Sequence, residues 1–505
     1  MRSKKAFINL IWAFVELAVT TAASFIVPNL IIRAFGSGVN GLVSSIKQFL
    51  HYIALVESGI GAIGRASLYK PLASGDNDEL SGDYRAIEDF YRKVAHVFLI
   101  YVVILIFLFP FLVEQDFDWV YTAILIAILA FSTFVQYYFG ITNQTLIQSD
   151  QKKHISSGLT CITTALNTIL TIILIKMGMG IHAVKIGSSL VFLIRPIFLH
   201  HYVKTHYRID KTKEPRNEIL TQRWDGLAQH IAFFIHKNTD VAVLTVLANL
   251  KEVSVYSVYS LAIAGCAKVV NIFSSSLEPA FGNMIARGEK ETLKSRVSLC
   301  ATITGQVAVI LFSTTAFIIT PFVQIYTKGV TDANYIRPAF GIIMLIAEAF
   351  YCVRLPYQSA VYAAGHFRQT RNGAVIEAVL NIFISVMLVR IYGLIGVAVG
   401  TLVSMMYRTI QYIWYYHVKL LGEPTGLSDE WKRLGISLCE ITVYYIALSF
   451  APKYEINGYT TWFVYSVGIG LFCLVIALLF SRLFYRKQWD DLMRIVSRFH
   501  TTSSR

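Results

Sequence analysis

Runs of apolar residues alternate with short polar segments along the whole chain. A membrane-spanning helix needs about 20 apolar residues, and windows of about 19 residues locate such helices. Fourteen windows of this kind predict spans near 8–32, 40–64, 94–113, 119–147, 155–175, 181–203, 224–249, 254–280, 297–322, 336–362, 373–391, 394–416, 434–451 and 460–481. We therefore expect an all-α polytopic membrane protein.

Two stretches of the chain, 155–204 and 369–419, repeat each other. Each copy is predicted to be an apolar helix, a glycine-rich turn and a second apolar helix. Asparagine, glycine and arginine recur at matching positions, namely Asn167, Gly187 and Arg195 in the first copy and Asn381, Gly400 and Arg408 in the second. A period of about 214 residues is too long for a solenoid and indicates duplicated helical bundles.

The duplication extends beyond this pair, because Leu72–Asp76 and Ile285–Glu289 also match at an offset of 213 residues. Spans one to six therefore correspond to spans seven to twelve. Since six is an even number, the two lobes have the same orientation in the membrane. The predicted domains are a six-helix lobe at 1–205, a basic cytoplasmic linker at 206–223, a second six-helix lobe at 224–419, an extra helix pair at 420–485 and a basic cytoplasmic tail at 486–505.

The basic residues predict the orientation. With the N-terminus in the cytoplasm, cytoplasmic segments hold 31 of the 45 Lys and Arg residues, and external turns hold six. This distribution follows the positive-inside rule and places both termini in the cytoplasm. The net charge of +14 then reflects topology, and its natural partner is anionic lipid headgroups rather than nucleic acid.

Several classes of chemistry lack support in the sequence. The six cysteines all fall within predicted spans, without the spacing of a metal site or a disulfide framework. Nucleotide-binding, hydrolase and metalloprotease motifs are absent, and no predicted loop is long enough to form a soluble catalytic domain. We expect a protein that is not an enzyme and needs no cofactor or metal.

Charged residues inside the predicted spans are the candidates for function. Each would cost about 2.5–3.5 kcal/mol if it faced lipid, so most should face a watery interior or pair with one another. Lys237 and Asp240 are three residues apart, so a static ion pair is an alternative for them. Lys268 stands alone, and we expect it to face a cavity. The charges nearest the middle of the bilayer are Glu16, Lys237, Asp240, Lys268 and Glu348.

A second group of charges lies nearer the cytoplasmic ends of the spans. Arg195, Arg354 and Arg408 could line a vestibule, although long arginine side chains can also reach the interface without contacting a substrate. Glu57 and Glu377 could serve as proton sites, although an acid in such a place is more often a helix-end or packing charge. We retain all five as candidates.

The chain resembles the polysaccharide transporters, which include the Wzx-type O-antigen and capsule flippases, within the multidrug/oligosaccharidyl-lipid/polysaccharide exporter superfamily. The resemblance rests on the run from Gly393 to Thr401 behind Asn381, on the turn 252–256, and on the segment 277–280 followed by 286–288. It implies alternating access around a cavity between two six-helix lobes. It also implies a lateral portal for a lipid tail, with spans one, two, seven and eight lining the cavity.

The resemblance implies a flippase that moves polyprenyl-pyrophosphate-linked oligosaccharides from the inner to the outer leaflet of the bacterial plasma membrane. In this hypothesis Lys268, Lys237 and the vestibule arginines bind the pyrophosphate, whereas Asp240, Glu16, Glu57, Glu348 and Glu377 are cavity or ion-coupling acids. We expect a monomer. Whether it needs a polysaccharide polymerase and a chain-length regulator as partners stays open, and so does the coupling ion, H⁺ or Na⁺. The alternatives are a flippase of peptidoglycan precursors and a drug/cation antiporter of the same superfamily.

Overall fold

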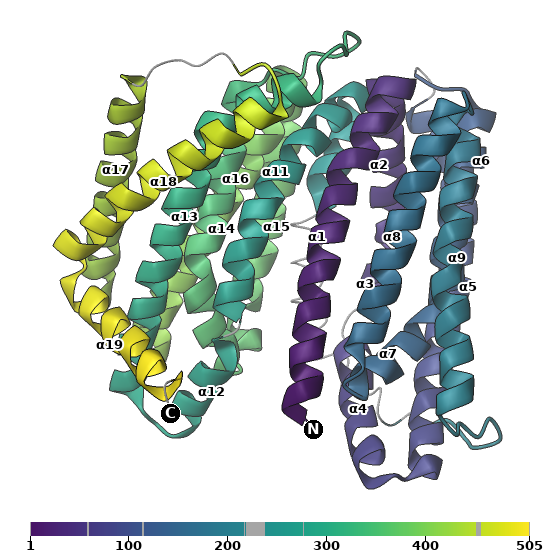
Figure 1. Cartoon of the computed structure of the whole chain (residues 1–505), viewed down its shortest axis with the longest axis horizontal. Coiled ribbons are helices and arrows are strands. Elements are labelled where there is room, and N and C mark those ends of the chain that lie inside the picture. Colours follow the sequence, from purple (N-terminus) through teal and green to yellow (C-terminus); the bar gives the residue numbers. More distant parts are fainter. Residues whose placement is uncertain are drawn as a thin grey trace. The chain divides into compact units, whose positions relative to one another are not determined.

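The computed structural model describes residues 2–57, 60–113, 116–216, 218, 238–275, 277–450 and 456–503. These residues are almost entirely helical, and this part of the chain contains no β-strand (Figure 1). Eleven helices among them are long and apolar enough to cross a membrane. The predicted class, an all-α polytopic membrane protein, is confirmed. The total of fourteen spans and the cytoplasmic position of both termini stay predictions.

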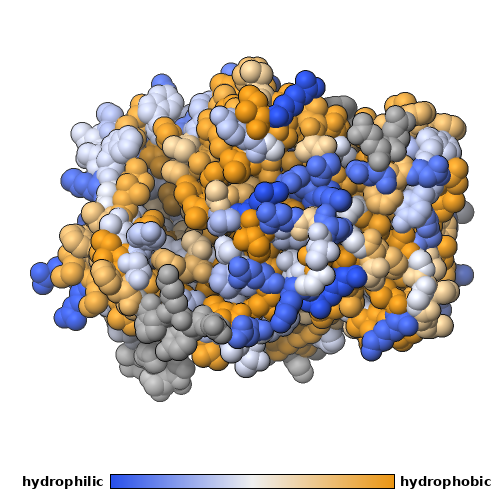
Figure 2. All heavy atoms as spheres, turned by 90° about the horizontal axis from the view of Figure 1, so that it is seen from above, coloured by the Kyte–Doolittle hydropathy of each residue, from blue (hydrophilic) through white to orange (hydrophobic). Residues whose placement is uncertain are grey.

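The outward faces of the long helices carry large apolar side chains. On α5 (Asn77–Leu112), Ile100, Phe107 and Phe111 have exposed fractions of 63%, 58% and 62%. Exposed apolar surface of this extent along a helix is expected where the surroundings are lipid rather than water. Figure 2 looks onto the ends of the helices and shows hydrophilic residues on that end face, with many hydrophobic residues at its margins.

The helices form two compact units, which we call unit 1 (Met1–Ser254 with Gly329–Ala333) and unit 2 (Val255–Lys328 with Asn334–Arg505). This division falls within α11 (Leu250–Ser275), and the predicted domain boundaries stay predictions. Unit 1 contains α1 (Arg2–Phe35), α2 (Ser37–His51), α3 (Ala54–Glu57), α4 (Ile60–Ser74), α5, α6 (Trp119–Val135), η1 (Gln136–Gly140), α7 (Ile141–Ser149), α8 (Lys153–Lys176), α9 (Ile181–His206) and the short helix Asn238–Leu247. Unit 2 contains most of α11 and α12 (Glu278–Ala286), α13 (Lys290–Tyr326), α14 (Pro338–Ala363), α15 (Phe367–Tyr392), α16 (Leu394–Trp414), η3 (Tyr415–Leu420), α17 (Gly426–Ser449), α18 (Tyr459–Phe484) and α19 (Arg486–Ser503).

In unit 1, α1 packs along α8, and α8 forms an antiparallel hairpin with α9 (Figure 1). Helix α6 packs against α2, α5 and α9. The span predicted at 40–64 is not one continuous helix, because α2 ends at His51 and α3 and α4 follow as separate helices. This segment carries Lys47, His51 and Glu57, so its apolar runs are too short for an uninterrupted span.

In unit 2, α15 and α16 form the hairpin that repeats α8 and α9, and α14 packs against α16. The long helix α13 contacts α14, α17, α18 and α19. Trp462 of α18 donates its indole N–H to the carbonyl of Ile318 on α13 at 3.0 Å. The helices beyond the repeat therefore attach to unit 2 mainly along α13.

The glycine-rich turn of the second copy permits close packing between its two helices. Gly393 ends α15 with a φ of 55°, a conformation that L-residues with a side chain rarely adopt. A Cβ atom at Gly396 would lie 2.5 Å from the backbone carbon of Leu388, so a side chain there would push the helices apart. These two glycines shape the hairpin.

Candidate functional site

The two arginines at matching repeat positions each bind the preceding helix of their own hairpin. In unit 2, Arg408 Nε of α16 lies 3.3 Å from Glu377 Oε2 of α15. In unit 1, Arg195 of α9 donates through Nε to Thr163 Oγ1 of α8 at 2.5 Å. Thr163 and Glu377 are 214 residues apart, as the repeated asparagines are. The repeat therefore preserves the position of this contact, while the partner differs in charge.

Glu377 also binds a second arginine, so three charged side chains form one buried cluster in unit 2. Arg354 Nη1 of α14 lies 2.7 Å from Glu377 Oε1. The exposed fractions are 3% for Arg354, 5% for Glu377 and 2% for Arg408. Arg408 also donates to the Thr370 carbonyl and the Tyr412 hydroxyl. Because two guanidinium groups share one carboxylate, a substrate anion would have to compete with Glu377 for them.

Arg195 lies in a different environment from Arg408. It donates to Thr164 Oγ1 at 3.0 Å as well as to Thr163. Its guanidinium carbon Cζ lies over the ring of Phe192, 4.8 Å from the ring centroid. Glu16 of α1 is close enough to attract it electrostatically. Arg195 is therefore held mainly by neutral oxygen atoms, with one acid nearby, and no described residue forms an ion pair with it at contact distance.

The described charges among those predicted near the middle of the bilayer do not form one cluster within either unit. Lys268 of α11 is exposed and makes no hydrogen bond or ion pair with a described residue. Glu348 is partly buried on α14 of the same unit. Asp240, only 5% exposed, lies in the helix Asn238–Leu247 of unit 1, near the Tyr52 hydroxyl. Lys237, and with it the predicted pairing to Asp240, lies outside the described residues.

Glu57 accepts hydrogen bonds from two tyrosine hydroxyl groups inside unit 1. Tyr91 of α5 and Tyr137 of η1 lie 3.1 Å and 2.9 Å from its two carboxylate oxygens. The two hydroxyl groups thus give each carboxylate oxygen a hydrogen bond without adding charge. The arrangement ties α3 to α5 and η1, and whether Glu57 also carries a coupling ion stays a prediction.

Two lysines of unit 1 were not among the predicted site residues. Lys185 of α9 is 3% exposed, and Lys47 of α2 is exposed. The charges of these two lysines are close enough to repel each other. The signal in the sequence is that neither α2 nor α9 contains an acidic residue. A lysine within a span that has no acid on its own helix cannot be explained by local pairing.

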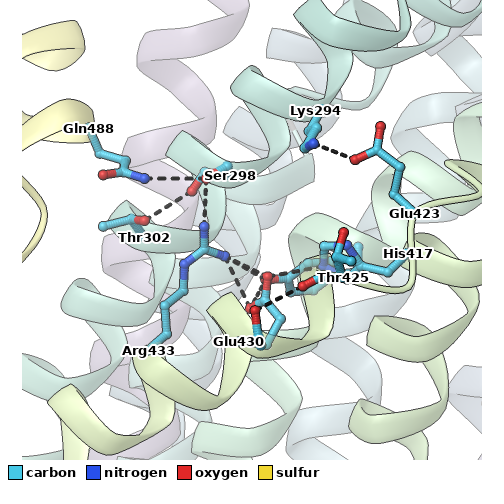
Figure 3. Close-up of polar contacts among 11 residues, drawn as sticks. Lys294, Ser298, Thr302, His417, Glu423, Thr425, Glu430, Arg433 and Gln488 are labelled. Atoms are coloured by element: carbon cyan, nitrogen blue, oxygen red, sulfur yellow. Dashed lines mark hydrogen bonds and ion pairs between the residues drawn. The ribbon is translucent and has the colours of Figure 1, made fainter.

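A polar network at one end of unit 2 joins the repeat to the helices that follow it (Figure 3). Arg433 of α17 lies 2.9 Å from Glu430 Oε1, and it donates to Ser298 Oγ of α13 at 2.5 Å. Glu430 also contacts His417 Nε2 of η3 at 3.1 Å and accepts the hydroxyl of Tyr357 on α14 at 2.5 Å. The network therefore connects α13, α14, η3 and α17.

The network determines the ionisation of Glu430, which precedes the predicted span 434–451. Burial alone would raise the pKa of Glu430. The hydrogen bonds from His417 and Tyr357 and the charge of Arg433 outweigh burial and hold the pKa of Glu430 below its ordinary value. The carboxylate of Glu430 is therefore ionised. A second ion pair, between Lys294 and Glu423, lies beside this network (Figure 3).

The segment after α9 folds back onto the N-terminal part of α5. Arg216 Nη1 lies 2.7 Å from Glu79 Oε1 and 3.3 Å from Asp83 Oδ1, and the Arg216 backbone N–H donates to the Gly82 carbonyl. Burial raises the pKa of Asp83 from its ordinary 3.8 to about 6, although the charge of Arg216 opposes the shift. The first part of the predicted linker 206–223 is thus fastened to unit 1.

Solved structures of membrane transporters are similar to this fold. The lipid II flippase MurJ in an inward closed conformation gives a TM-score of 0.70 at 16% identity, covering 95% of this chain and 99% of its own. An inward-facing multidrug resistance MATE family transporter of the MOP superfamily gives a TM-score of 0.59 at 12% identity, covering 81% of this chain and 98% of its own. A mutant of the Vibrio cholerae MATE transporter VcmN gives a TM-score of 0.58 at 15% identity, covering 83% of this chain and 98% of its own.

The comparisons therefore establish the fold of this chain, which is similar to that of MOP-superfamily transporters, and they agree with a multi-pass membrane protein. No family model matches the chain, and no curated protein matches it. The narrower resemblance to Wzx-type polysaccharide transporters stays a prediction. Among the described residues, no group of three or more His, Cys, Asp or Glu side chains is placed to hold a metal ion.

Proposed function

We propose that this protein is a flippase that moves polyprenyl-pyrophosphate-linked oligosaccharides from the inner to the outer leaflet of the bacterial plasma membrane by alternating access. The observation that carries the proposal is that several cations within the spans lack an acidic partner of their own, in a fold similar to that of a lipid flippase. In unit 2, Arg354 and Arg408 share the single carboxylate of Glu377, and Lys268 has no described partner. In unit 1, Lys47 and Lys185 lie on helices without acids.

Cations without an acidic partner of their own suit a substrate that carries a diphosphate. A charged residue within a span is costly unless water or a counter-charge compensates it, so unpaired cations favour a polar interior that an anion can enter. Arginine and lysine are also the side chains that bind phosphate oxygens most strongly. A drug/cation antiporter would need a cavity in which acids dominate, which these residues do not support.

The membrane potential acts in the proposed direction of transport. Moving one negative charge outward across an inside-negative membrane gains about 2.3 kcal/mol per 100 mV. The diphosphate of the proposed substrate carries more than one such charge. Export can therefore proceed without an ion gradient unless charges of the protein or a coupling ion move with the lipid.

A flippase of peptidoglycan precursors is the second candidate. Its support is the lipid II flippase structure, which covers more of this chain than the MATE structures do. Both candidates involve a polyprenyl diphosphate, so the cations of the spans suit either. The glycan carried by the lipid distinguishes them.

Deleting the gene and analysing the lipid-linked intermediates tests the proposal. We expect an undecaprenyl-diphosphate oligosaccharide to accumulate on the cytoplasmic leaflet, and a plasmid copy of the gene to restore its normal level. Accumulation of lipid II instead would favour the second candidate. Unchanged lipid pools together with a new sensitivity to cationic dyes would contradict both flippase functions and favour the antiporter.

A further inference from the structure

Lys185 is a buried cation for which the fold of unit 1 provides no counter-charge. Its side chain is 3% exposed and makes no hydrogen bond or ion pair with a described residue. Burying an ammonium group without a partner is among the most costly arrangements in a protein. Such a residue is retained where a ligand supplies the missing partner or where the charge has another function.

The helices around Lys185 contain no acidic residue. Lys185 lies on α9, which packs against α6, η1, α7 and α8. None of these five elements contains an aspartate or a glutamate. The one acid of the neighbouring helix α1 is Glu16, and its electrostatic partners are Arg195 and Cys161. The protein therefore offers Lys185 no carboxylate from the helices that bury it.

Lys47 lies close enough to Lys185 for their charges to repel each other. It lies on α2, which has no acidic residue either, and α2 and α9 both pack against α6. Ser44, Lys47, Gln48 and His51 follow one another at helical spacing and all keep some exposed surface. Lys47 thus belongs to a polar, accessible face of unit 1, whereas Lys185 lies deeper.

An unpaired polar atom lies on the helix that packs beside the buried lysine. On α8, the Thr171 hydroxyl is buried and has no hydrogen-bond partner. Residue 171 lies nearly level with residue 185 in this hairpin, because the turn at 177–180 joins the two helices. At the position that matches Lys185 in the second copy, 213 residues later, stands Ala398. The hairpin fold therefore does not require a lysine at this position.

We propose that Lys47 and Lys185 form an anion-binding subsite within unit 1 that takes the phosphate or diphosphate group of the transported lipid. Two ammonium groups near one another can share a group that carries more than one negative charge, and this relieves their mutual repulsion. Lys47 on the accessible face would meet the anion first, and Lys185 would hold it more deeply. The inference rests on the proposed function, and it assigns the headgroup contact to unit 1.

Lipid binding to the purified full-length protein tests the subsite. Native mass spectrometry would compare undecaprenyl diphosphate, undecaprenyl phosphate and undecaprenol, which share a tail and differ in charge. We expect Lys47→Gln and Lys185→Gln each to weaken undecaprenyl diphosphate binding about tenfold or more, with undecaprenol binding unchanged. Lys185→Arg keeps the charge and should bind nearly as wild type does. Lys176→Gln, at an exposed lysine of α8, is the matched control.

Thermal unfolding separates this assignment from a structural one. If Lys185 serves a ligand, Lys185→Met should raise the unfolding temperature of the lipid-free protein, because an uncompensated buried charge is removed. A structural lysine would give a lower unfolding temperature.

Undecaprenyl diphosphate binding that is equal in wild type, Lys47→Gln and Lys185→Gln would overturn the subsite and leave the proposed function intact. Wild-type protein that binds undecaprenol as well as it binds undecaprenyl diphosphate would contradict the proposed function itself. A preference for undecaprenyl diphosphate over undecaprenyl phosphate that disappears in both glutamine variants would assign the two lysines to the diphosphate.

Discussion

At Glu377, one carboxylate lies between two buried guanidinium groups, and it is the nearest counter-charge that either arginine has in the described part of unit 2. Removing one partner of a buried ion pair leaves an uncompensated charge and costs about 3–5 kcal/mol. We therefore expect Glu377→Gln to destabilise the protein by about that amount. Chemical unfolding of the detergent-purified protein measures the change.

The repeat supplies the matched control for this prediction. Thr163 occupies the corresponding position in unit 1 and accepts a hydrogen bond from Arg195. Replacing it with valine removes one hydrogen-bond acceptor and no charge, so Thr163→Val should cost only about 1 kcal/mol. Equal losses for the two variants would show that Glu377 is not the counter-charge on which the cluster depends.

Asp83 should make stability depend on pH. Burial raises the pKa of Asp83 to about 6 in the folded protein, whereas the unfolded chain has the ordinary value of 3.8. The folded state therefore binds the proton more tightly, and this contribution to stability is present below about pH 4 and is lost as the pH rises to about 6. Asp83→Asn should remove the decline between pH 4 and pH 6.

Unfolding temperatures of wild type and Asp83→Asn, measured in parallel from pH 4 to pH 7, check this prediction. Only the difference between the two proteins matters, because other groups titrate in both. The difference should change in favour of the variant as the pH rises. A constant difference across this range would mean that Asp83 titrates at its ordinary pKa.

At the level of single residues, the sequence predicted which charges lie within apolar spans but not what they contact. The matching positions of Arg195 and Arg408 could be predicted, because the repeat fixes them. That Arg354 reaches the same carboxylate as Arg408 depends on how α14 packs against the hairpin, which no local pattern encodes. Lys185 escaped prediction because the lack of an acid on its own helix becomes significant only when the helices packed around it are known to lack acids as well.

Among the secondary-structure elements, α17 depends on the polar network around Glu430. The pKa of Glu430 in the folded protein is held below its ordinary value. Ionised Glu430 therefore stabilises the protein at any pH above that ordinary value, and this stabilisation is lost as the pH falls through the folded-state pKa. We expect Glu430→Gln to loosen α17 from α13 and η3 at neutral pH. Hydrogen exchange of 426–433 should accelerate in the variant.

The neighbouring residue Lys432 provides the control for the Glu430 variant. Its ion pair with Asp429 is exposed, with side-chain fractions of 72% and 66%, and exposed pairs contribute little to stability. Lys432→Gln should therefore leave hydrogen exchange of α17 unchanged. If both variants accelerate exchange equally, the network does not hold the helix.

The helix hairpins depend on their glycines for close approach. Gly396→Ala would place a Cβ atom 2.5 Å from backbone atoms of Leu388, and backbone cannot move aside as a flexible side chain can. We expect a clear loss of folded protein, measured by size-exclusion chromatography after detergent extraction. Gly180→Ala, in the turn of the first copy, meets nothing within 4 Å and should be tolerated.

Hydropathy was sufficient to predict a membrane-spanning helix wherever an apolar run is long and uninterrupted, as in α5, α13 and α18. It was insufficient at 40–64, where polar residues divide the segment into α2, α3 and α4. The π-helical turns η1 and η3 also escaped prediction, because such turns arise from packing rather than from a local sequence pattern. One of them carries His417 to Glu430.

At the scale of the whole molecule, the fold was accessible from the sequence because a duplicated bundle leaves a repeat that can be aligned by eye. The transported substrate was harder to predict from the sequence than the fold. The repeat reflects the scaffold, whereas the functional hypothesis depends on charges that differ between the two copies. Lys185 against Ala398 and Thr163 against Glu377 are two such differences. The two halves have thus kept one architecture and acquired different electrostatics.

The most direct measurement of the central claim is lipid translocation by the purified protein in liposomes. A fluorescent undecaprenyl-diphosphate oligosaccharide would be incorporated in both leaflets, and a membrane-impermeant reductant would be added outside. We predict that nearly all of the fluorescence is lost when the protein is present, while labelled phosphatidylcholine in the inner leaflet stays protected. If the inner-leaflet oligosaccharide stays as protected as in protein-free liposomes, although the protein is folded and inserted, the protein is not a flippase of this lipid.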